Sequence, residues 1–203
     1  MTTLTNLMIN DEVLALATAQ GLTITVEYSE GHDSPRESCS STLVTSNNNV
    51  TSAAEAKLPS GEWGSNIEEA ISNYARLNSI DEADMMWWPV YAYVHGNVVF
   101  AIESFNSRWD SGLIGFIYES KKAIREEFSV KRISSNLTDE ITQRIKDELS
   151  VLTDWANGTI YAVSISKDGE HLDSLSGIYS QNDKYTSEVA LEMIHNHCDD
   201  KAA

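Results

Sequence analysis

The first group of side chains that could do chemistry is spread over a loop, a hairpin turn and a bend. It consists of Asp33, Arg36, Glu37, His95 and Asp110. If these residues met at one end of a sheet, they could position a charged ligand or transfer protons. An ion pair between Arg36 and Asp110 could equally be a buried strut that holds the loop to the bend. We favour this structural interpretation, because many ion pairs with perturbed pKa values are structural.

The C-terminal segment has the composition of a metal site but lacks the spacing. It contains His195, His197, Cys198, Asp199 and Asp200. On a helix, His195 and His197 point to different faces, whereas zinc-binding helices place their ligands three or four residues apart. We therefore expect no metal, and we interpret residues 198–203 as a flexible tail.

Motifs that would indicate an enzyme do not occur in the sequence. There is no Gly-rich phosphate loop, no Gly-x-Ser-x-Gly elbow and no Cys-x-x-Cys pair. The two cysteines, Cys39 and Cys198, lie far apart in unrelated segments, which favours reduced thiols over a disulfide framework. The sequence predicts a protein without catalytic activity or cofactor.

Net charge is the strongest global feature. The 203 residues include 31 acidic and 14 basic ones, which gives a net charge of −17. The acidic excess extends along the whole chain and is not confined to a tail. Each contact to a phosphate needs a cation, so direct binding of DNA or RNA is disfavoured. A basic protein surface is the expected partner.

Acidic residues at both ends of one predicted helix are the candidate contacts to such a partner. Glu68 and Glu69 fall in the first turn of a helix that Ser65 or Asn66 would cap. Asp81, Glu82 and Asp84 follow the helix as an acidic patch.

The stretch from Trp87 to Phe128 is expected to form the scaffold that positions these groups. Apolar runs at 89–94 and 97–102 flank Gly96 and predict a hairpin. A bend at Trp109-Asp110-Ser111-Gly112 leads to a third apolar run, 113–118, and a helix follows from Ser120.

Periodicity and capping signals predict the other elements. Expected helices begin at the cap residues Asn10 and Thr138, and another spans 186–197; expected strands are 22–28, 41–45 and a hairpin of 159–166 with 170–179. Leu22, Ile24, Val26 and Tyr28 should share one face of a strand in the main sheet. Residues 46–65 are polar and predict a long surface loop or insertion.

These elements together predict an α+β fold with a single domain over residues 1–203. Its mainly antiparallel sheet should have five to seven strands, with helices packed mostly on one face. No apolar run reaches the roughly 18 residues of a membrane span, and the N-terminus lacks a signal-peptide pattern. We expect a cytoplasmic protein.

Several motifs resemble a family of uncharacterised accessory proteins carried by phages and plasmids. The resemblance covers about two thirds of the chain and is carried by Ser34-Pro35-Arg36-Glu37, Trp109-Asp110-Ser111-Gly112, Gly115-Phe116-Ile117-Tyr118, Ser120-Lys121 through Arg125-Glu126-Glu127, and the hairpin from Val163 to Gly177. It implies a structural role for Pro35, Arg36, Glu37, Trp109, Asp110, Ser111 and Gly112, and location in a host cytoplasm. It brings no catalytic mechanism. This chain departs from the family pattern at Ser38-Cys39-Ser40, where relatives have an aromatic residue and an Asp-Asn pair.

Three functions follow as hypotheses. The leading one is an acidic protein of a phage or mobile element that binds and inhibits a host nucleic-acid-handling defence protein, of restriction or CRISPR type, by mimicking nucleic acid. The second is a small ligand-binding protein or enzyme that uses the Arg36 and Asp110 region. The third is a phage structural or assembly factor. A homodimer through an uncovered sheet edge is also compatible with the sequence.

Overall fold

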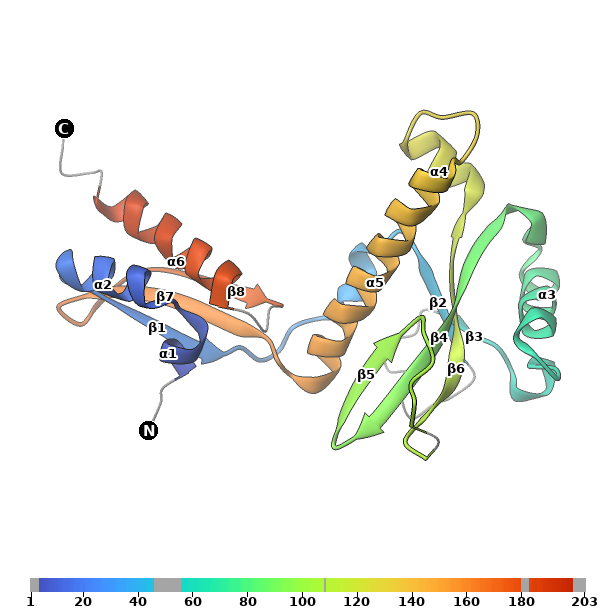
Figure 1. The fold of residues 1–203 in the computed structure, drawn as a ribbon, viewed down its shortest axis with the longest axis horizontal. Coiled ribbons are helices and arrows are strands. Elements are labelled where there is room, and N and C mark those ends of the chain that lie inside the picture. Colours follow the sequence, from blue (N-terminus) through green and yellow to red (C-terminus); the bar gives the residue numbers. More distant parts are fainter. Residues whose placement is uncertain (1–3, 46–55, 108, 180–182, 199–203) are drawn as a thin grey trace. The chain divides into compact units, whose positions relative to one another are not determined.

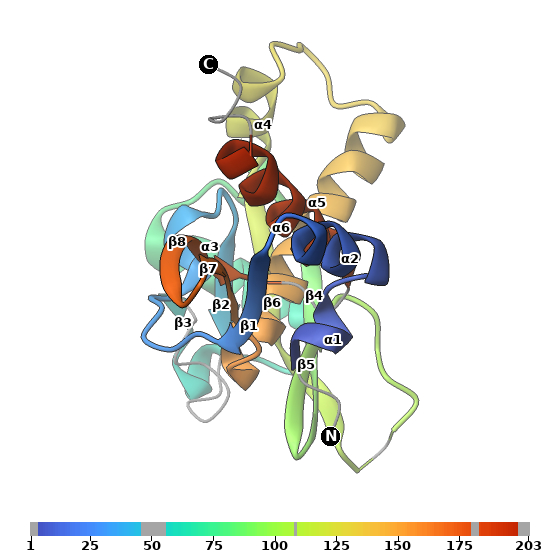
Figure 2. The same ribbon diagram turned by 90° about the vertical axis from the view of Figure 1, so that its left-hand side faces the viewer.

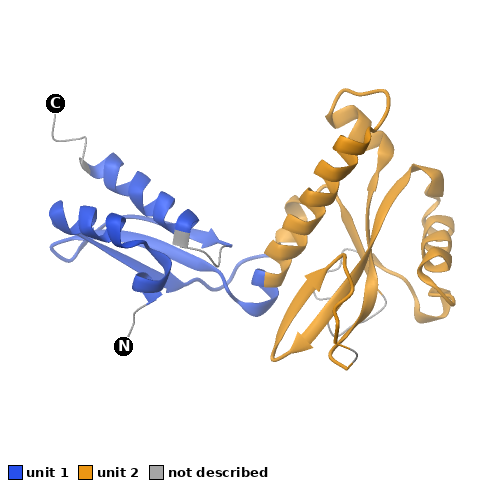
Figure 3. Cartoon of the chain, in the orientation of Figure 1, with its two compact units in different colours: residues 1–33, 154–203 blue, residues 34–153 orange. Residues whose placement is uncertain are grey.

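The computed structural model describes residues 4–45, 56–107, 109–179 and 183–198 (Figure 1). Contacts within the chain group it into two compact units (Figure 3). Unit 1 consists of residues 1–33 and 154–203, and unit 2 of residues 34–153. The sequence analysis treated the chain as one domain. Each unit has its own sheet, so the two are described separately.

Unit 1 contains a three-stranded antiparallel sheet. Its strands are β1 (Leu22–Tyr28), β7 (Tyr161–Lys167) and β8 (Glu170–Ile178), in the order β1-β7-β8. The predicted hairpin around Asp168-Gly169 connects β7 to β8. The predicted alternation of β1 is confirmed for Leu22, Ile24 and Val26, which are buried, whereas Tyr28 is 60% exposed. The strand belongs to this smaller sheet, because its partner is β7 and not the scaffold hairpin.

Helices α1 (Leu4–Met8), α2 (Asp11–Ala19) and α6 (Asp183–Cys198) belong to the same unit. Asn10 caps α2 as predicted, since its Oδ1 accepts a hydrogen bond from the Val13 backbone N–H at 3.0 Å. Figure 2 shows α2 and α6 side by side. Their apolar residues form one core with the inward side chains of β1 and β7.

Unit 2 contains a five-stranded sheet in the order β3-β2-β6-β4-β5. The strands are β2 (Thr42–Thr45), β3 (Ala56–Lys57), β4 (Met85–His95), β5 (Asn97–Ala101) and β6 (Ser111–Ser120). Only β2 and β3 run parallel. The hairpin between β4 and β5 turns at Gly96, whose φ of 80° is easily reached only by glycine.

The helices of this unit are α3 (Ile67–Asn78), α4 (Lys121–Glu127) and α5 (Ser135–Asn157), the last of which continues across the boundary into unit 1. Single 3₁₀ turns occur at η1 (Pro35–Ser38), η2 (Ser60–Glu62) and η3 (Glu82–Asp84). Of the two cap residues predicted for α3, the structure selects Asn66, and α4 begins directly after Ser120, which caps it. The long helix begins earlier than predicted, because Ser134 and not Thr138 accepts the first backbone N–H.

Helices α3 and α5 lie on opposite faces of the larger sheet. Phe116 and Tyr118 of β6 contact Tyr74 of α3. Glu119, the residue after Tyr118, points to the other face and accepts a hydrogen bond from Arg144 of α5. The predicted α+β class with mostly antiparallel strands is confirmed. The strands divide into two sheets, however, and the predicted packing of helices on one face of a sheet holds for unit 1 only.

The predicted loop 46–65 is only partly described. Residues 46–55 lie outside the described part of the chain, and residues 56–65 contain β3 and η2. Among the described residues, no helix is long and apolar enough to cross a membrane.

Candidate functional site

Arg36, the most buried charged residue of the predicted loop, is held by α5 and by its own segment. Its side chain is 2% exposed and its Nη1 lies 2.8 Å from Oε2 of Glu148. Its Nη2 donates to the backbone oxygen of Ser41 at 2.7 Å and to the Ser41 hydroxyl at 2.9 Å. That hydroxyl in turn donates to Glu148. The bonds fasten residues 34–41 to α5.

A second buried ion pair adjoins the first. Arg144 of α5 donates to Glu119 at 2.6 Å and to Glu127 at 2.7 Å, and its guanidinium lies 5.9 Å from the ring centre of Phe128. Ser40 donates to the other oxygen of Glu119 at 3.2 Å. Burial raises the pKa of Glu119 above its ordinary value, although Arg144 opposes the shift. Burial would lower the pKa of Arg144, but its bonds to the two glutamates raise it overall.

The predicted pair of Arg36 with Asp110 is wrong. Arg36 and Ser41 lie at the end of β6 marked by Glu119, whereas Asp110 precedes Ser111 at the other end. The ten residues of β6, at about 3.3 Å each, put about 30 Å between the two ends. The strut exists, but its acidic partner is Glu148.

The bend at residues 109–112 forms its own cluster with the β4–β5 hairpin. Asp110 accepts from the Ser107 hydroxyl at 3.3 Å and lies 3.9 Å from His95 Nδ1, so these two members of the five-residue group are close together, whereas Arg36 is not with them. Trp109 is 91% exposed. It contributes almost no buried surface to the fold.

The five candidate partner-binding acids occupy two places. Glu68 and Glu69 start α3, while Asp81, Glu82 and Asp84 follow its end. The twelve residues of α3 span about 18 Å at about 1.5 Å each. The five acids therefore do not form one patch.

Three of these acids have structural bonds. Asp84 accepts from the Lys122 backbone N–H at 2.9 Å and from the Ser120 hydroxyl, which holds the start of α4. Asp81 accepts from the backbone N–H of Ala83 in η3, and Glu69 accepts from the backbone N–H of Ser65, the residue before the cap of α3, at 2.8 Å. Glu68 and Glu82 are exposed, and no side-chain bond to another described residue is found for either.

One contact between a serine and a histidine was missed by the sequence analysis, which treated residues 29–38 as turn-forming loop. Ser29 Oγ lies 2.7 Å from His32 Nε2. The carbonyl of His32 accepts from the Trp155 indole at 3.0 Å, and its ring lies edge-on to Tyr179. A catalytic Ser–His pair also needs an orienting group and donors for an oxyanion. The contacts found here instead close the loop, so we assign them to its structure.

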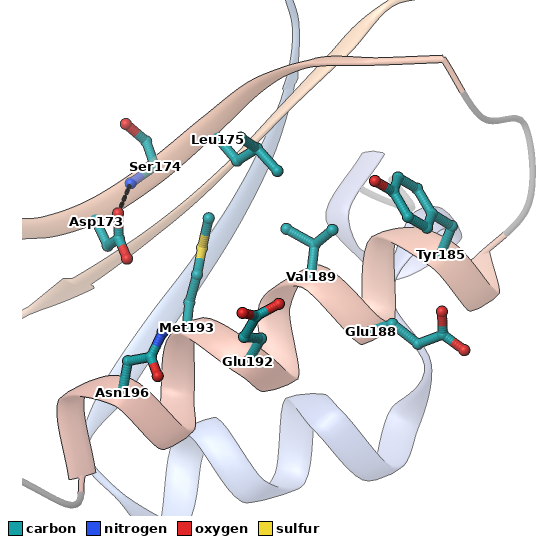
Figure 4. Close-up of a pocket in the computed structure, with 9 residues that line it drawn as sticks. All are labelled: Asp173, Ser174, Leu175, Tyr185, Glu188, Val189, Glu192, Met193 and Asn196. Atoms are coloured by element: carbon teal, nitrogen blue, oxygen red, sulfur yellow. Dashed lines mark hydrogen bonds between the residues drawn. The ribbon is translucent and has the colours of Figure 1, made fainter.

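An open groove lies between β8 and α6 in unit 1, and it was not predicted from the sequence. It encloses about 390 Å³ and is lined from the strand by Asp173, Ser174 and Leu175 and from the helix by Tyr185, Glu188, Val189, Glu192, Met193 and Asn196 (Figure 4). The helical members recur every three or four residues and so share one side of α6. This spacing was visible in the sequence, but the partner strand was not.

The groove combines an apolar floor with an acidic rim. Val189 and Met193 are buried, while Leu175 is 43% exposed at its edge. Figure 4 shows Val189 and Met193 directed from α6 toward β8. Glu188 and Glu192 are exposed, and Asp173 lies 3.5 Å from Nε2 of His197 at the far end of the helix. Such a surface suits a cation with an aliphatic stem.

No group of three or more His, Cys, Asp or Glu side chains suited to a metal ion occurs among the described residues. His195 is exposed, and His197 pairs with Asp173 as noted. Asp199 and Asp200 lie outside the described residues, as does the side chain of Cys198. Cys39 is not part of a disulfide, and its thiol donates to the backbone oxygen of Pro35 at 3.5 Å.

Comparison with known proteins gave no match: no family model, no curated protein and no solved structure is similar to this chain. The resemblance to phage and plasmid accessory proteins therefore stays a prediction that rests on its motifs.

Proposed function

We propose that the protein is a non-catalytic acidic binding protein that engages a positively charged surface of another protein. The partner class is a nucleic-acid-handling protein, such as a restriction or CRISPR-type nuclease of a host cell. The acidic protein would occupy the cationic groove in which that partner holds nucleic acid, and would thereby inhibit it.

The observation that carries the proposal is the way the charges are distributed. Seven basic side chains form ion pairs with carboxylates of the same chain: Arg36, Arg76, Lys122, Arg125, Arg144, Lys146 and Lys184. Among the described acidic residues, only Glu119 and Asp154 are buried. Half of the 14 basic side chains are therefore paired within the chain, while most of the described carboxylates are at least partly exposed to solvent. A protein with net charge −17 in this arrangement attracts basic surfaces and repels nucleic acid.

A competition assay tests the proposal. Purified protein is added to a panel of restriction and CRISPR-type nucleases, and displacement of labelled duplex DNA is followed by fluorescence anisotropy. We expect displacement from at least one nuclease at low ionic strength, and we expect it to weaken steeply as salt is raised, because the contacts are ionic. Failure to bind any member of the panel, or binding that salt leaves unchanged, would contradict the proposal.

Two exposed acids allow a matched test of the predicted patches. Glu68→Gln and Glu82→Gln remove charge without touching a structural bond, whereas Asp84→Asn would disturb the start of α4. If the patches contact the partner, the double variant inhibits less and keeps the melting temperature of the parent. Unchanged inhibition would mean that other carboxylates contact the partner.

The alternative of a ligand-binding protein or enzyme at Arg36 and Asp110 loses its geometric basis, because these residues lie at opposite ends of β6. The alternative of an assembly factor predicts association that is insensitive to salt. The same assay therefore separates it from the proposal.

A further inference from the structure

We infer that the groove between β8 and α6 binds an extended segment of the partner in which lysine or arginine occupies alternate positions. This inference rests on the proposed function and names the surface that performs it. The proposed occupant is a segment of a protein. Binding of small amines or of a second copy of this chain would be an alternative outcome of the test.

The length of the groove fits a short extended peptide. Its helical lining runs from Tyr185 to Asn196, eleven residues along α6, which is about 16 Å at about 1.5 Å per residue. An extended chain covers about the same length with five residues. A single amino acid or a small amine would leave most of the groove empty.

The spacing of the carboxylates fits alternation. Glu188 and Glu192 are four residues apart on one helix, so they are about 6 Å apart along its axis. In an extended segment, residues i and i+2 point the same way and are about 6.6 Å apart. Two cations at such positions would each face one carboxylate, and Asp173 offers a third from the strand.

The apolar floor adds selectivity that charge alone would not give. Leu175, Val189 and Met193 offer aliphatic surface on which the stem of arginine or lysine can lie while its charged end reaches the rim. The exposed ring of Tyr185 offers a face for a guanidinium.

The side chains of the bound segment should determine recognition, and not its addition to the sheet as a further strand beside β8. β8 is an edge strand, but its pairing with β7 shifts register between Tyr161 and Val163 and again between Ile165 and Ser166. The N–H of Ser174 is already bonded to the Asp173 carboxylate at 2.8 Å. Such irregularities oppose continuous pairing along an edge. They also disfavour a second copy of this chain, whose acidic rim would repel this one.

The test uses the full chain and two fluorescein-labelled pentapeptides of equal composition and charge. One has the sequence Arg-Ser-Arg-Ser-Arg and the other Arg-Arg-Arg-Ser-Ser, both capped at their ends. Anisotropy gives their affinities, and NMR shifts of the labelled protein locate them. We expect the alternating peptide to bind about threefold tighter or more, with shifts along β8 and α6.

Variants separate the groove from general charge. Glu188→Gln with Glu192→Gln should weaken the alternating peptide by about three- to tenfold. Asp139→Asn with Glu140→Gln removes the same charge from exposed positions on α5 and should weaken it less than about twofold. Leu175→Thr keeps the net charge but removes apolar surface from the groove, so it should also weaken binding of the alternating peptide.

Each outcome decides one question. Equal weakening by both charge pairs, equal affinity for both peptides, or NMR shifts outside the groove would overturn the inference and leave the proposed function standing. A dimer in sedimentation that the groove variants dissociate would assign the surface to a second copy and would also overturn it. If the protein bound neither peptide and displaced DNA from no nuclease in the competition assay, the proposed function itself would be contradicted.

Discussion

Arg36 shows how the role of a single residue depends on its partner. The guanidinium is buried in unit 2 and bonded to Glu148 and Ser41, so its charge is compensated within the protein. A charge in this position is unsuited to capturing a ligand from solvent. Its neighbour Pro35 starts η1 with φ already fixed, which presents Arg36 to α5.

Arg36→Ala should lower the free energy of unfolding by about 3 kcal/mol, because it leaves the Glu148 carboxylate, which is only 12% exposed, without its cationic partner. Urea denaturation of the variant and the parent measures this difference. Arg76→Ala is the matched control: its pair with Glu62 is exposed, so a loss of no more than about 1 kcal/mol is expected. If both changes lowered the free energy of unfolding equally, the Arg36–Glu148 pair would contribute no more than an exposed ion pair.

Glu119 should make stability depend on pH. Because burial raises the pKa of Glu119 in the folded state, the folded protein binds a proton there more tightly than the unfolded chain does. Between the unfolded and the folded pKa, the free energy of unfolding therefore falls as pH rises, and the protonated form is the more stable one. The measurement is the urea midpoint at several pH values from acidic to neutral.

Glu119→Gln should remove that decrease from the pH profile, because a glutamine side chain does not titrate. Other carboxylates titrate in both proteins, so the informative quantity is the difference between the two profiles. A constant difference across the whole range would show that the pKa of Glu119 is the same folded and unfolded.

At the scale of elements, β6 is the strand on which unit 2 is built. It pairs with β2 on one edge and β4 on the other, and its side chains reach α3 on one face and α5 on the opposite one. Close approach to β2 is only compatible with glycine at one position: a Cβ on Gly115 would lie 2.0 Å from the carbonyl oxygen of Val44.

Gly115→Ala should therefore destabilise unit 2 by about 3 kcal/mol or more, since the clash is with backbone and strands β2 and β6 must separate. Gly112→Ala, on the same strand, is the control. A Cβ there meets nothing within 4 Å, so a change within about 0.5 kcal/mol is expected. Thermal unfolding of both variants, with hydrogen exchange at β2, measures the effect. A small loss at Gly115 would mean that β2 can shift at little cost.

At the scale of the whole molecule, two electrostatic effects oppose one another. The net charge of −17 makes the surface repel itself, which destabilises the compact state. The ion pairs that hold Arg76, Lys146 and Lys184 on the surface act in the opposite direction. Salt screens both effects.

We expect self-repulsion to dominate, because surface ion pairs contribute little each. Raising sodium chloride from about 0.01 M to about 0.5 M should then raise the melting temperature by a few degrees, roughly 2–5 °C. Potassium chloride at the same ionic strength is the control for effects of a particular ion. A melting temperature that falls with salt would show that the ion pairs outweigh the repulsion.

Local features of the fold were predictable from the sequence because neighbouring residues cause them. The caps at Asn10, Asn66 and Ser120 and the turns at Gly96 and Gly169 all depend on a few adjacent side chains and on glycine dihedral angles. Net charge likewise needs only composition. From these, the α+β class and the two hairpins followed.

Tertiary structure alone decided which distant residues meet. The choice of Glu148 over Asp110 as the partner of Arg36 and the placement of β1 beside β7 both join segments far apart in the chain. In the sequence, Glu148 and Asp110 are equally acceptable as the acidic partner of Arg36. The pairing is fixed only when burial removes water from one of them, because that is where an uncompensated charge becomes costly.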